Sequence, residues 1–297
     1  MNYKQLNTFN DWTKGQKDQF TVSIIKGLVI DGVRKANSGH PGGPMSLADF
    51  SYILYSEYLI FDSTNPDWDL RDRLVLSVGH TCMLLYTLLY LSDILTMEDL
   101  KQFRQLDSRT PGHPEIETPG VDANTGPLGQ GVGMATGMAL AERMLSARLS
   151  KNRKQYTYVL VGDGDLQEPI ALGAATLAGH WELSQLIMFY DKNDIQIAGK
   201  TSRCDSTNYA DLFKAMNWNV QEIDGHDHEQ IRRAIENGQE SSLPTIIIGN
   251  TTIAKGSATL ENTSQSHGAP FSPEEIIATK QKLGLPEHES FYCPAEI

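Results

Sequence analysis

The segments YTYVLVGDGDLQEP (residues 156–169) and QLIMFYDKNDI (residues 185–195) decide the fold of this chain. The apolar runs at 156–161 and 185–190 are short, rich in Val, Ile and aromatic residues, and typical of buried strands in a parallel sheet. The residues between them are expected to form the crossover helix. Because ligands in such sheets bind beyond the carboxyl ends of the strands, the polar residues that follow each run mark the expected site.

Two oxygen ligands follow these two strands, Asp163 after the first and Asn193 after the second. Mg²⁺ prefers near-octahedral oxygen coordination, usually shared between one or two protein groups and the phosphates of a substrate or cofactor. Gly162 and Gly164 let the backbone approach a phosphate closely. The pattern therefore predicts a diphosphate held through a metal, although Asp163 and Asn193 would also suit ordinary turns at strand ends.

The remaining pattern alternates helices and strands. Helices are expected over 16–36, from about Ser46, over 82–92, from about Gln130 to Leu149 and over 227–239, and strands at 73–77, 218–222 and 244–250. This order predicts an α/β fold, a parallel sheet covered by helices on both faces. We expect a single domain over 1–297, with an N-terminal arm (1–15) and a C-terminal tail (285–297) that are peripheral.

Composition limits the classes of function. The 297 residues are 40% hydrophobic, enough for a sizeable core, and the net charge of −12 argues against nonspecific nucleic acid binding. No apolar run reaches the length of a membrane helix, and the N-terminus lacks the apolar core of a signal peptide. The sequence thus predicts a cytoplasmic protein that binds neither nucleic acid nor membrane. Its three cysteines are expected to be free thiols.

Four of the eight histidines lie in loops rich in Gly or Pro: His40 (SGHPGG), His80 (SVGHT), His113 (TPGHPE) and His267 (QSHGAP). Loops that need Gly for close backbone approach are where ligands are commonly met. Any one of these histidines could be a surface or capping residue. Together they predict a site that uses imidazole as donor, acceptor or proton shuttle near neutral pH.

The chain resembles transketolase in seven ordered segments, which cover roughly residues 15–290. The segments are ANSGHPGGPMSLAD (36–49), NPDWDLRDRLVLSVGH (65–80), TPGHPE (110–115), TGPLGQG (125–131), GDGDLQEP with its Asn about thirty residues later, TTIAKGS (251–257) and SHGAPFSPEEI (266–276). GDG alone is weak evidence because Asp-Gly pairs commonly close turns. The resemblance implies the thiamine diphosphate-binding fold and the cofactors thiamine diphosphate and Mg²⁺, for which Ca²⁺ or Mn²⁺ could substitute.

The resemblance also implies roles for the loop histidines. His80 and His267 would donate to the cofactor diphosphate, and His267 would also reach the reacting centre. His40 and His113 would face the sugar hydroxyls and the oxyanion that forms on the donor carbonyl.

For the other site residues, the resemblance implies contacts with the cofactor and the metal. Gly126 and Leu128 would contact the aminopyrimidine and thiazolium rings of the cofactor, although TGPLGQG could also be a plain turn before a helix. Asp163, Asn193 and the carbonyl of Ile195 would bind the metal, with the diphosphate and a water. Glu168 resembles a subunit-interface glutamate, although acidic residues also suit the start of a helix.

The activity implied is the transfer of a two-carbon ketol unit from a ketose phosphate to an aldose acceptor. The chain resembles an amino-terminal transketolase subunit, or a truncated domain, expected to be inactive alone and to form a two-plus-two heterotetramer with a carboxy-terminal subunit. Alternatives are another thiamine diphosphate enzyme, of the 2-oxo acid dehydrogenase or deoxyxylulose phosphate synthase type, and a noncatalytic partner-binding protein. Gly173, where the family often has an interface carboxylate, and Val78, where Asn is frequent, depart from the pattern.

Overall fold

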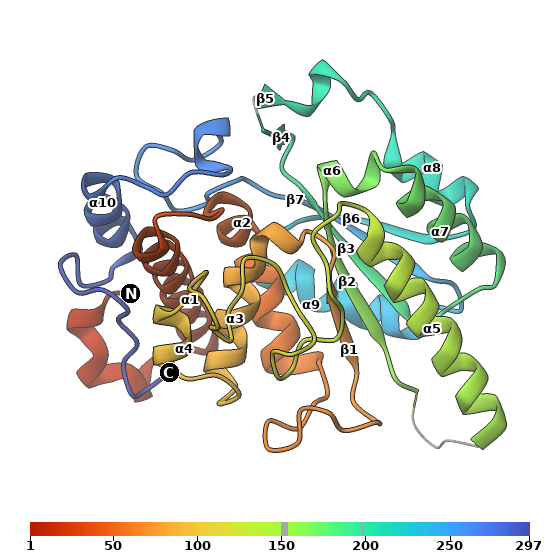
Figure 1. Ribbon diagram of the computed structural model, residues 1–297, viewed down its shortest axis with the longest axis horizontal. Coiled ribbons are helices and arrows are strands. Elements are labelled where there is room, and N and C mark those ends of the chain that lie inside the picture. The colour runs from red at the N-terminus through yellow and green to blue at the C-terminus, as the bar shows by residue number, and fades with distance from the viewer. Residues whose placement is uncertain (150–153, 198) are drawn as a thin grey trace.

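The computed structural model describes residues 1–149, 154–197 and 199–297. Its centre is a parallel sheet with strand order β1-β2-β3-β7-β6 (Figure 1). The strands are β1 (Arg73–Leu76), β2 (Thr157–Gly162), β3 (Leu186–Lys192), β6 (Asn219–Asp224) and β7 (Thr245–Asn250). A separate antiparallel pair joins β4 (Ile195–Gln196) to β5 (Gly199–Lys200). The predicted parallel sheet is confirmed.

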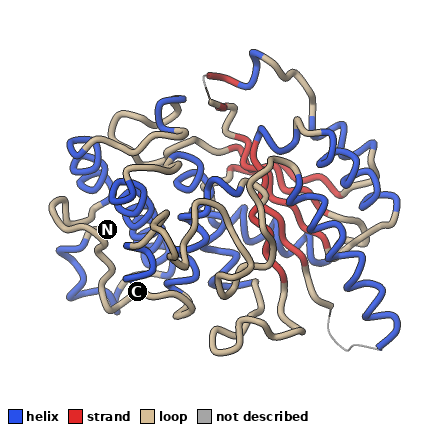
Figure 2. The backbone as a smooth tube through the Cα atoms, viewed as in Figure 1, coloured by secondary structure: helices blue, strands red, loops and turns tan. Residues whose placement is uncertain are grey.

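Alternate strand residues enter two hydrophobic clusters. In β2, Tyr158 and Leu160 belong to one cluster, whereas Val159 and Val161 belong to the other. The first cluster includes residues of α1 (Lys14–Ala36), α2 (Gly42–Ile53), α3 (Cys82–Leu91) and α9 (His228–Glu240). The second includes residues of α5 (Gln130–Leu149), α7 (Pro169–His180) and α8 (Tyr209–Ala215). Helices thus cover both faces of the sheet, as predicted (Figure 2).

Several boundaries differ from the sequence-based expectation. Helix α2 begins at Gly42, whereas the sequence analysis expected it to begin at about Ser46. Pro44 is compatible with the earlier start, since it lies in the first turn, where backbone N–H groups need no intrahelical partner. The crossover between β2 and β3 consists of two helices, α6 (Asp163–Leu166) and α7, and Pro169 is the first residue of α7. The short α4 (Met97–Lys101), α8 and the β4–β5 pair were not predicted, nor was the longer α10 (Pro273–Leu283).

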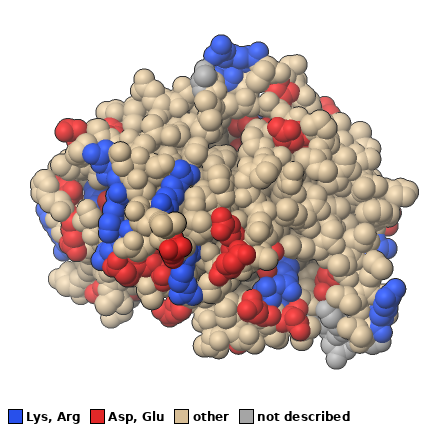
Figure 3. All heavy atoms as spheres, viewed as in Figure 1, with Lys and Arg blue, Asp and Glu red and all other residues tan. Residues whose placement is uncertain are grey.

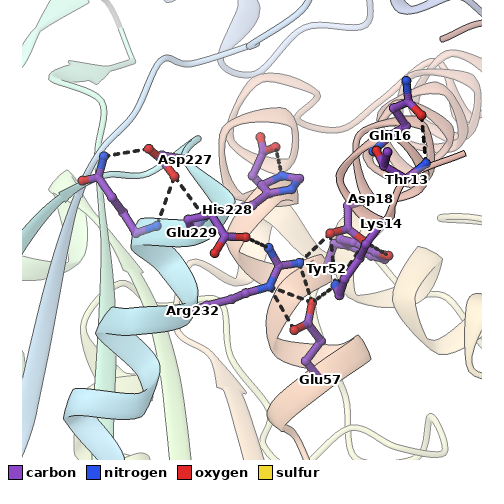
Figure 4. A network of polar contacts seen from close by, with 12 residues as sticks. Thr13, Lys14, Gln16, Asp18, Tyr52, Glu57, Asp227, His228, Glu229 and Arg232 are labelled. Carbon is purple, nitrogen blue, oxygen red and sulfur yellow. Dashed lines mark hydrogen bonds and ion pairs between the residues drawn. The ribbon is translucent and has the colours of Figure 1, made fainter.

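Ion pairs connect the helices on the side of the sheet that carries the first hydrophobic cluster. Arg232 of α9 pairs with Asp18 of α1 and with Glu57 of the π-helical segment η2 (Leu54–Tyr58) (Figure 4). Lys280 of α10 lies 2.7 Å from the carboxylate of Asp31 on α1, and both side chains are buried. The remaining short helices are η1 (Tyr3–Asp11), η3 (Gly79–Thr81), η4 (Thr201–Arg203) and η5 (Ser264–Ser266).

The two terminal segments of the chain contact each other and the helices of the first hydrophobic cluster. The amide of Tyr3 donates to the carbonyl of Gly284 at 2.9 Å, and Trp12 and Leu285 are buried in the first cluster. The amide of Phe291 donates to Asp31 at 2.7 Å. None of the described helices is long and apolar enough to cross a membrane.

Candidate active site

One cavity of about 430 Å³ lies at the carboxyl ends of β2 and β3 and beyond the end of β1. Its lining includes every residue that the sequence analysis assigned to the site: His40, His80, His113, Gly126, Leu128, Gly162, Asp163, Gly164, Glu168, Asn193, Ile195 and His267. A larger hollow of about 1120 Å³ at the start of β1 and β2, around Arg71, Arg73 and Tyr156, contains none of them. The chemistry-bearing residues therefore converge at the edge that strand direction predicts.

Three of the four loop histidines form a packed cluster. The ring centroids of His40 and His80 lie 4.7 Å apart, and the ring of His267 lies 5.6 Å from that of His40 and 5.4 Å from that of His80. His113 also lines the cavity, and its ring borders Gly126, where an added Cβ would lie 3.3 Å from the imidazole. Gly126 has φ of +154°, a conformation that favours glycine.

Burial keeps these imidazoles neutral. Desolvation lowers the pKa of His80 to about 3 and that of His40 to about 4, and neighbouring histidines and Arg104 lower both further. Desolvation also lowers the pKa of His113 and that of His267. At neutral pH each ring therefore offers one N–H donor and one nitrogen acceptor, which is the state that proton transfer to or from a substrate requires.

Asp163 is a buried carboxylate whose surroundings favour a cation. Its Oδ1 accepts from the hydroxyl of Tyr190 at 2.7 Å, and its Oδ2 accepts from the amide of Asp194 at 3.1 Å. Burial raises its pKa to about 7, and the nearby carboxylates of Asp191 and Asp194 add to the rise. A divalent cation would relieve this cost because it stabilises the ionised form.

The Asn193 side chain is oriented by two hydrogen bonds. Its Oδ1 accepts from the amide of Ile195 at 3.0 Å, and its Nδ2 donates to Asp191 at 2.8 Å. Asp191 also accepts from Ser46 at 2.7 Å and from the hydroxyl of Thr251. Because a carbonyl oxygen has two lone pairs, Asn193 keeps one for a further partner.

Sequence reasoning missed Asp165, which joins three loops of the site. Its Oδ1 accepts from the Ser77 hydroxyl at 2.5 Å and from the amide of Gly129 at 2.8 Å, and its Oδ2 accepts from the amide of Gly162 at 3.1 Å. Its position two residues after Asp163 in GDGD was the available signal. Two of its partners, Ser77 and Gly129, lie 88 and 36 residues away along the chain and were not visible in the sequence.

Two of the histidines that sequence analysis left aside belong to a separate buried network. Both bond to Asp49 of α2: His226 through Nδ1 at 3.0 Å and His228 through Nε2 at 2.9 Å. Lys26 of α1 pairs with the same carboxylate at 3.1 Å. The Nε2 atom of His226 accepts from the amide of Thr252 at 3.0 Å, which fixes its proton on Nδ1. The other two, His180 and His288, are exposed.

The residues present fit a phosphorylated cofactor and a metal. Among the described residues, the buried Nδ1 atoms of His40 and His267 have no hydrogen-bond partner, so each is free to donate to or accept from a bound molecule, according to the tautomer of its ring. No group of three or more His, Cys, Asp or Glu in the described ranges is arranged to hold a metal ion. Mg²⁺ needs no such group when one or two oxygen ligands and a diphosphate share its coordination.

The sequence matches one protein family over most of its length. Residues 17–297 match the family described as transketolase, thiamine diphosphate binding domain. Transketolase of Bacillus subtilis is 47% identical over 285 residues, which cover 93% of this chain and 43% of that protein. The transketolase of Halalkalibacterium halodurans is 45% identical over 287 residues, 94% of this chain and 43% of its own length.

Solved structures agree. Transketolase from Campylobacter jejuni superimposes with a TM-score of 0.93 at 45% identity, covering 95% of this chain and 45% of that one. A Pichia stipitis transketolase complex with sedoheptulose 7-phosphate gives a TM-score of 0.90 at 41% identity, covering 94% of this chain and 42% of that one. The chain thus spans less than half the length of the relatives it matches. It belongs to the transketolase family, in which it corresponds to the amino-terminal, thiamine diphosphate-binding domain.

Proposed function

We propose that this chain is the thiamine diphosphate-binding half of a transketolase. Together with a separate carboxy-terminal subunit it would transfer a two-carbon ketol unit from a ketose phosphate to an aldose acceptor, in the cytoplasm. The observation that carries the proposal is the convergence of four loop histidines, the GDG loop and Asn193 on one cavity. Bound thiamine diphosphate would supply the electron sink for breaking and forming the carbon–carbon bond.

The chain's own residues would bind, orient and move protons. His80 and His267 would donate to the diphosphate, and His267 would reach the reacting centre. His40 and His113 would face the sugar hydroxyls and the donor carbonyl, where a neutral imidazole can give or take a proton. Asp163, Asn193 and the carbonyl of Ile195 would hold Mg²⁺, and Gly126 and Leu128 would contact the cofactor rings.

Assembly is part of the proposal because the relatives carry more than twice the matched length. The expected state is a heterotetramer of two copies of each subunit, with Glu168 at an interface. Exposed apolar side chains on α5 and α7 support an interface there, since large exposed apolar areas commonly mark association surfaces. They are Met134, Met144, Leu145, Leu149, Ile170 and Leu177. Figure 3 shows few charged side chains over this area.

Calorimetric titration of thiamine diphosphate into the purified chain, with and without Mg²⁺, tests the proposal. Weak Mg²⁺-dependent binding that tightens when the complementary subunit is added, with ketol transfer appearing only then, is the expected result. Robust turnover by the chain alone would contradict the requirement for a partner. No binding in any condition would favour a noncatalytic role.

A second candidate within the same cofactor class is tested by the choice of donor. Xylulose 5-phosphate as donor supports ketol transfer, whereas pyruvate as donor would indicate an enzyme of the 2-oxo acid dehydrogenase or deoxyxylulose phosphate synthase type. His40 and His113 both line the cavity and would supply hydrogen-bonding partners to a polyhydroxylated donor, which favours the sugar.

A further inference from the structure

Arg104 joins two loops of the candidate active site. It follows α4, and its Nη1 donates to the hydroxyl of Ser38 at 2.8 Å, whereas its Nη2 donates to the carbonyl of Gly112 at 3.3 Å. Ser38 lies two residues before His40, and Gly112 directly precedes His113. One side chain therefore sets the separation between the loops that carry these two histidines.

Among the residues that the structure describes, the charge of Arg104 has no acidic partner. Within the described ranges no ion pair to Asp or Glu involves it, and its buried Nε has no hydrogen-bond partner. The guanidinium lies 5.4 Å from the centroid of the Phe103 ring, a cation–π contact. In contrast, Arg71 and Arg73 both pair with Asp122. Arg104 is half-buried, so part of its guanidinium stays in contact with solvent while its Nε lies inside the protein.

The backbone conformation at Arg104 is also unfavourable for any residue other than glycine. Its φ is +60°, in the left-handed region where glycine is favoured. Its amide donates to the carbonyl of Thr110 at 2.9 Å, closing the turn that leads into TPGHPE. A long cationic side chain at such a position is best explained by what the side chain contacts.

The loop of His113 has a second, independent anchor. The hydroxyl of Tyr86 on α3 lies 3.0 Å from the carbonyl oxygens of both Pro111 and His113. This contact fixes the His113 loop to α3 but does not reach the His40 loop. The Arg104 side chain, in contrast, hydrogen-bonds to both loops.

We propose that Arg104 is a positioning residue of the active site, which ties the His40 loop to the His113 loop and faces the histidines with an uncompensated positive charge. This inference rests on the proposed function for its catalytic meaning. The groups that face His40 and His113 are His80 of η3, His267 beside η5, Glu115 and Arg104 itself. Burial is the larger reason why both rings stay neutral, and the positive charge of Arg104 further disfavours the imidazolium form, whereas Glu115 favours it at His113.

Imidazole titration by NMR on the ¹⁵N-labelled chain tests the effect of the Arg104 charge on the two histidines. Amide hydrogen exchange tests whether the Arg104 side chain holds the two loops together. Arg104→Met removes both, Arg104→Lys keeps the charge without the two-pronged geometry, and Ser38→Ala removes one hydrogen bond and keeps the charge. Arg109→Met is the matched control, since Arg109 lies five residues along the same segment and pairs with Asp99.

Arg104→Met is expected to raise the titration midpoints of His40 and His113 by roughly half a pH unit or more. Arg104→Lys and Ser38→Ala should leave these midpoints near the wild-type values, while all three variants speed amide exchange about tenfold in the non-proline residues of 36–43 and 108–114. Arg109→Met should change neither readout.

Unchanged midpoints in Arg104→Met, or an equal shift in Arg109→Met, would overturn the role of the charge. If Arg104→Met does not fold, Arg104→Lys and Ser38→Ala still test whether Arg104 links the two loops. Unchanged amide exchange in both variants would refute that link. These measurements need neither cofactor nor partner, so their failure is distinguishable from failure of ketol transfer.

Discussion

The hydroxyl of Tyr190 donates a 2.7 Å hydrogen bond to the carboxylate of Asp163, the residue expected to bind the metal. Tyr190 lies on β3, the strand paired with β2, which ends beside Asp163. Neighbouring parallel strands thus deliver the proposed metal ligand and the group that orients it.

Replacing Tyr190 by Phe should weaken Mg²⁺-dependent binding of thiamine diphosphate by about tenfold, because outer-shell partners fix the geometry of a ligating carboxylate. Asp163→Ala should abolish that binding. Calorimetry with both variants checks the prediction, and Tyr58→Phe is the control, since Tyr58 makes a comparable bond to Glu236 in another part of the fold. Wild-type affinity in Asp163→Ala would refute the metal assignment.

The buried histidines predict acid sensitivity of the cofactor-free chain. The pKa of His80 is lowered by burial to about 3, so the folded state stays neutral where the unfolded state gains a proton. Stability is therefore lost as pH falls below about 6.5, and His80 alone should reduce the free energy of unfolding by about 2 kcal/mol between pH 7 and pH 5. Urea unfolding at several pH values measures this slope. His80→Asn should flatten it, whereas the same change at the exposed His180 should not.

Gly164→Ala should impair cofactor binding without unfolding the chain. An added Cβ at Gly164 would lie 3.0 Å from Cδ1 of Leu128, which would have to shift in the cavity. Gly164 lies in the short helix α6, where Ala is the better helix former, so the melting temperature should stay equal or rise. Calorimetry should show weaker thiamine diphosphate binding in Gly164→Ala. If displacement of Leu128 is the cause, Gly164→Ala should weaken binding less when it is introduced into Leu128→Ala than when it is introduced into the wild-type chain.

The pair of Lys280 and Asp31 should stabilise the docking of α10 on α1. Their side chains are 2% and 4% exposed, so Lys280→Met would leave a buried carboxylate without its cation. Removing one partner of such a pair costs about 3–5 kcal/mol. Urea unfolding should show this loss for Lys280→Met, and the double variant with Asp31→Asn should recover part of it. An equal loss in the double variant would show that packing, not charge, is responsible.

The extent of sequence-based prediction differs between long and short elements. The strands of the sheet were predicted from short apolar runs, the long helix α1 from apolar residues at helical spacing, and α5 from a long segment rich in Ala and Met. Short elements such as α4 and α8 carry too few periodic positions. The start of α2 was misplaced because Gly and Pro suggested a turn, whereas they occupy the first turn of a helix.

The sequence by itself determined the parallel sheet, the family and the residues that line the site, because apolar period and Gly-rich loops are local patterns. Tertiary structure decided which polar groups meet. The roles of Asp165, Asp191 and Arg104 depend on partners that the chain brings together only when it folds. Hydrogen bonds and ion pairs act over a few ångströms in space, and nothing in the spacing of residues along the chain encodes those distances.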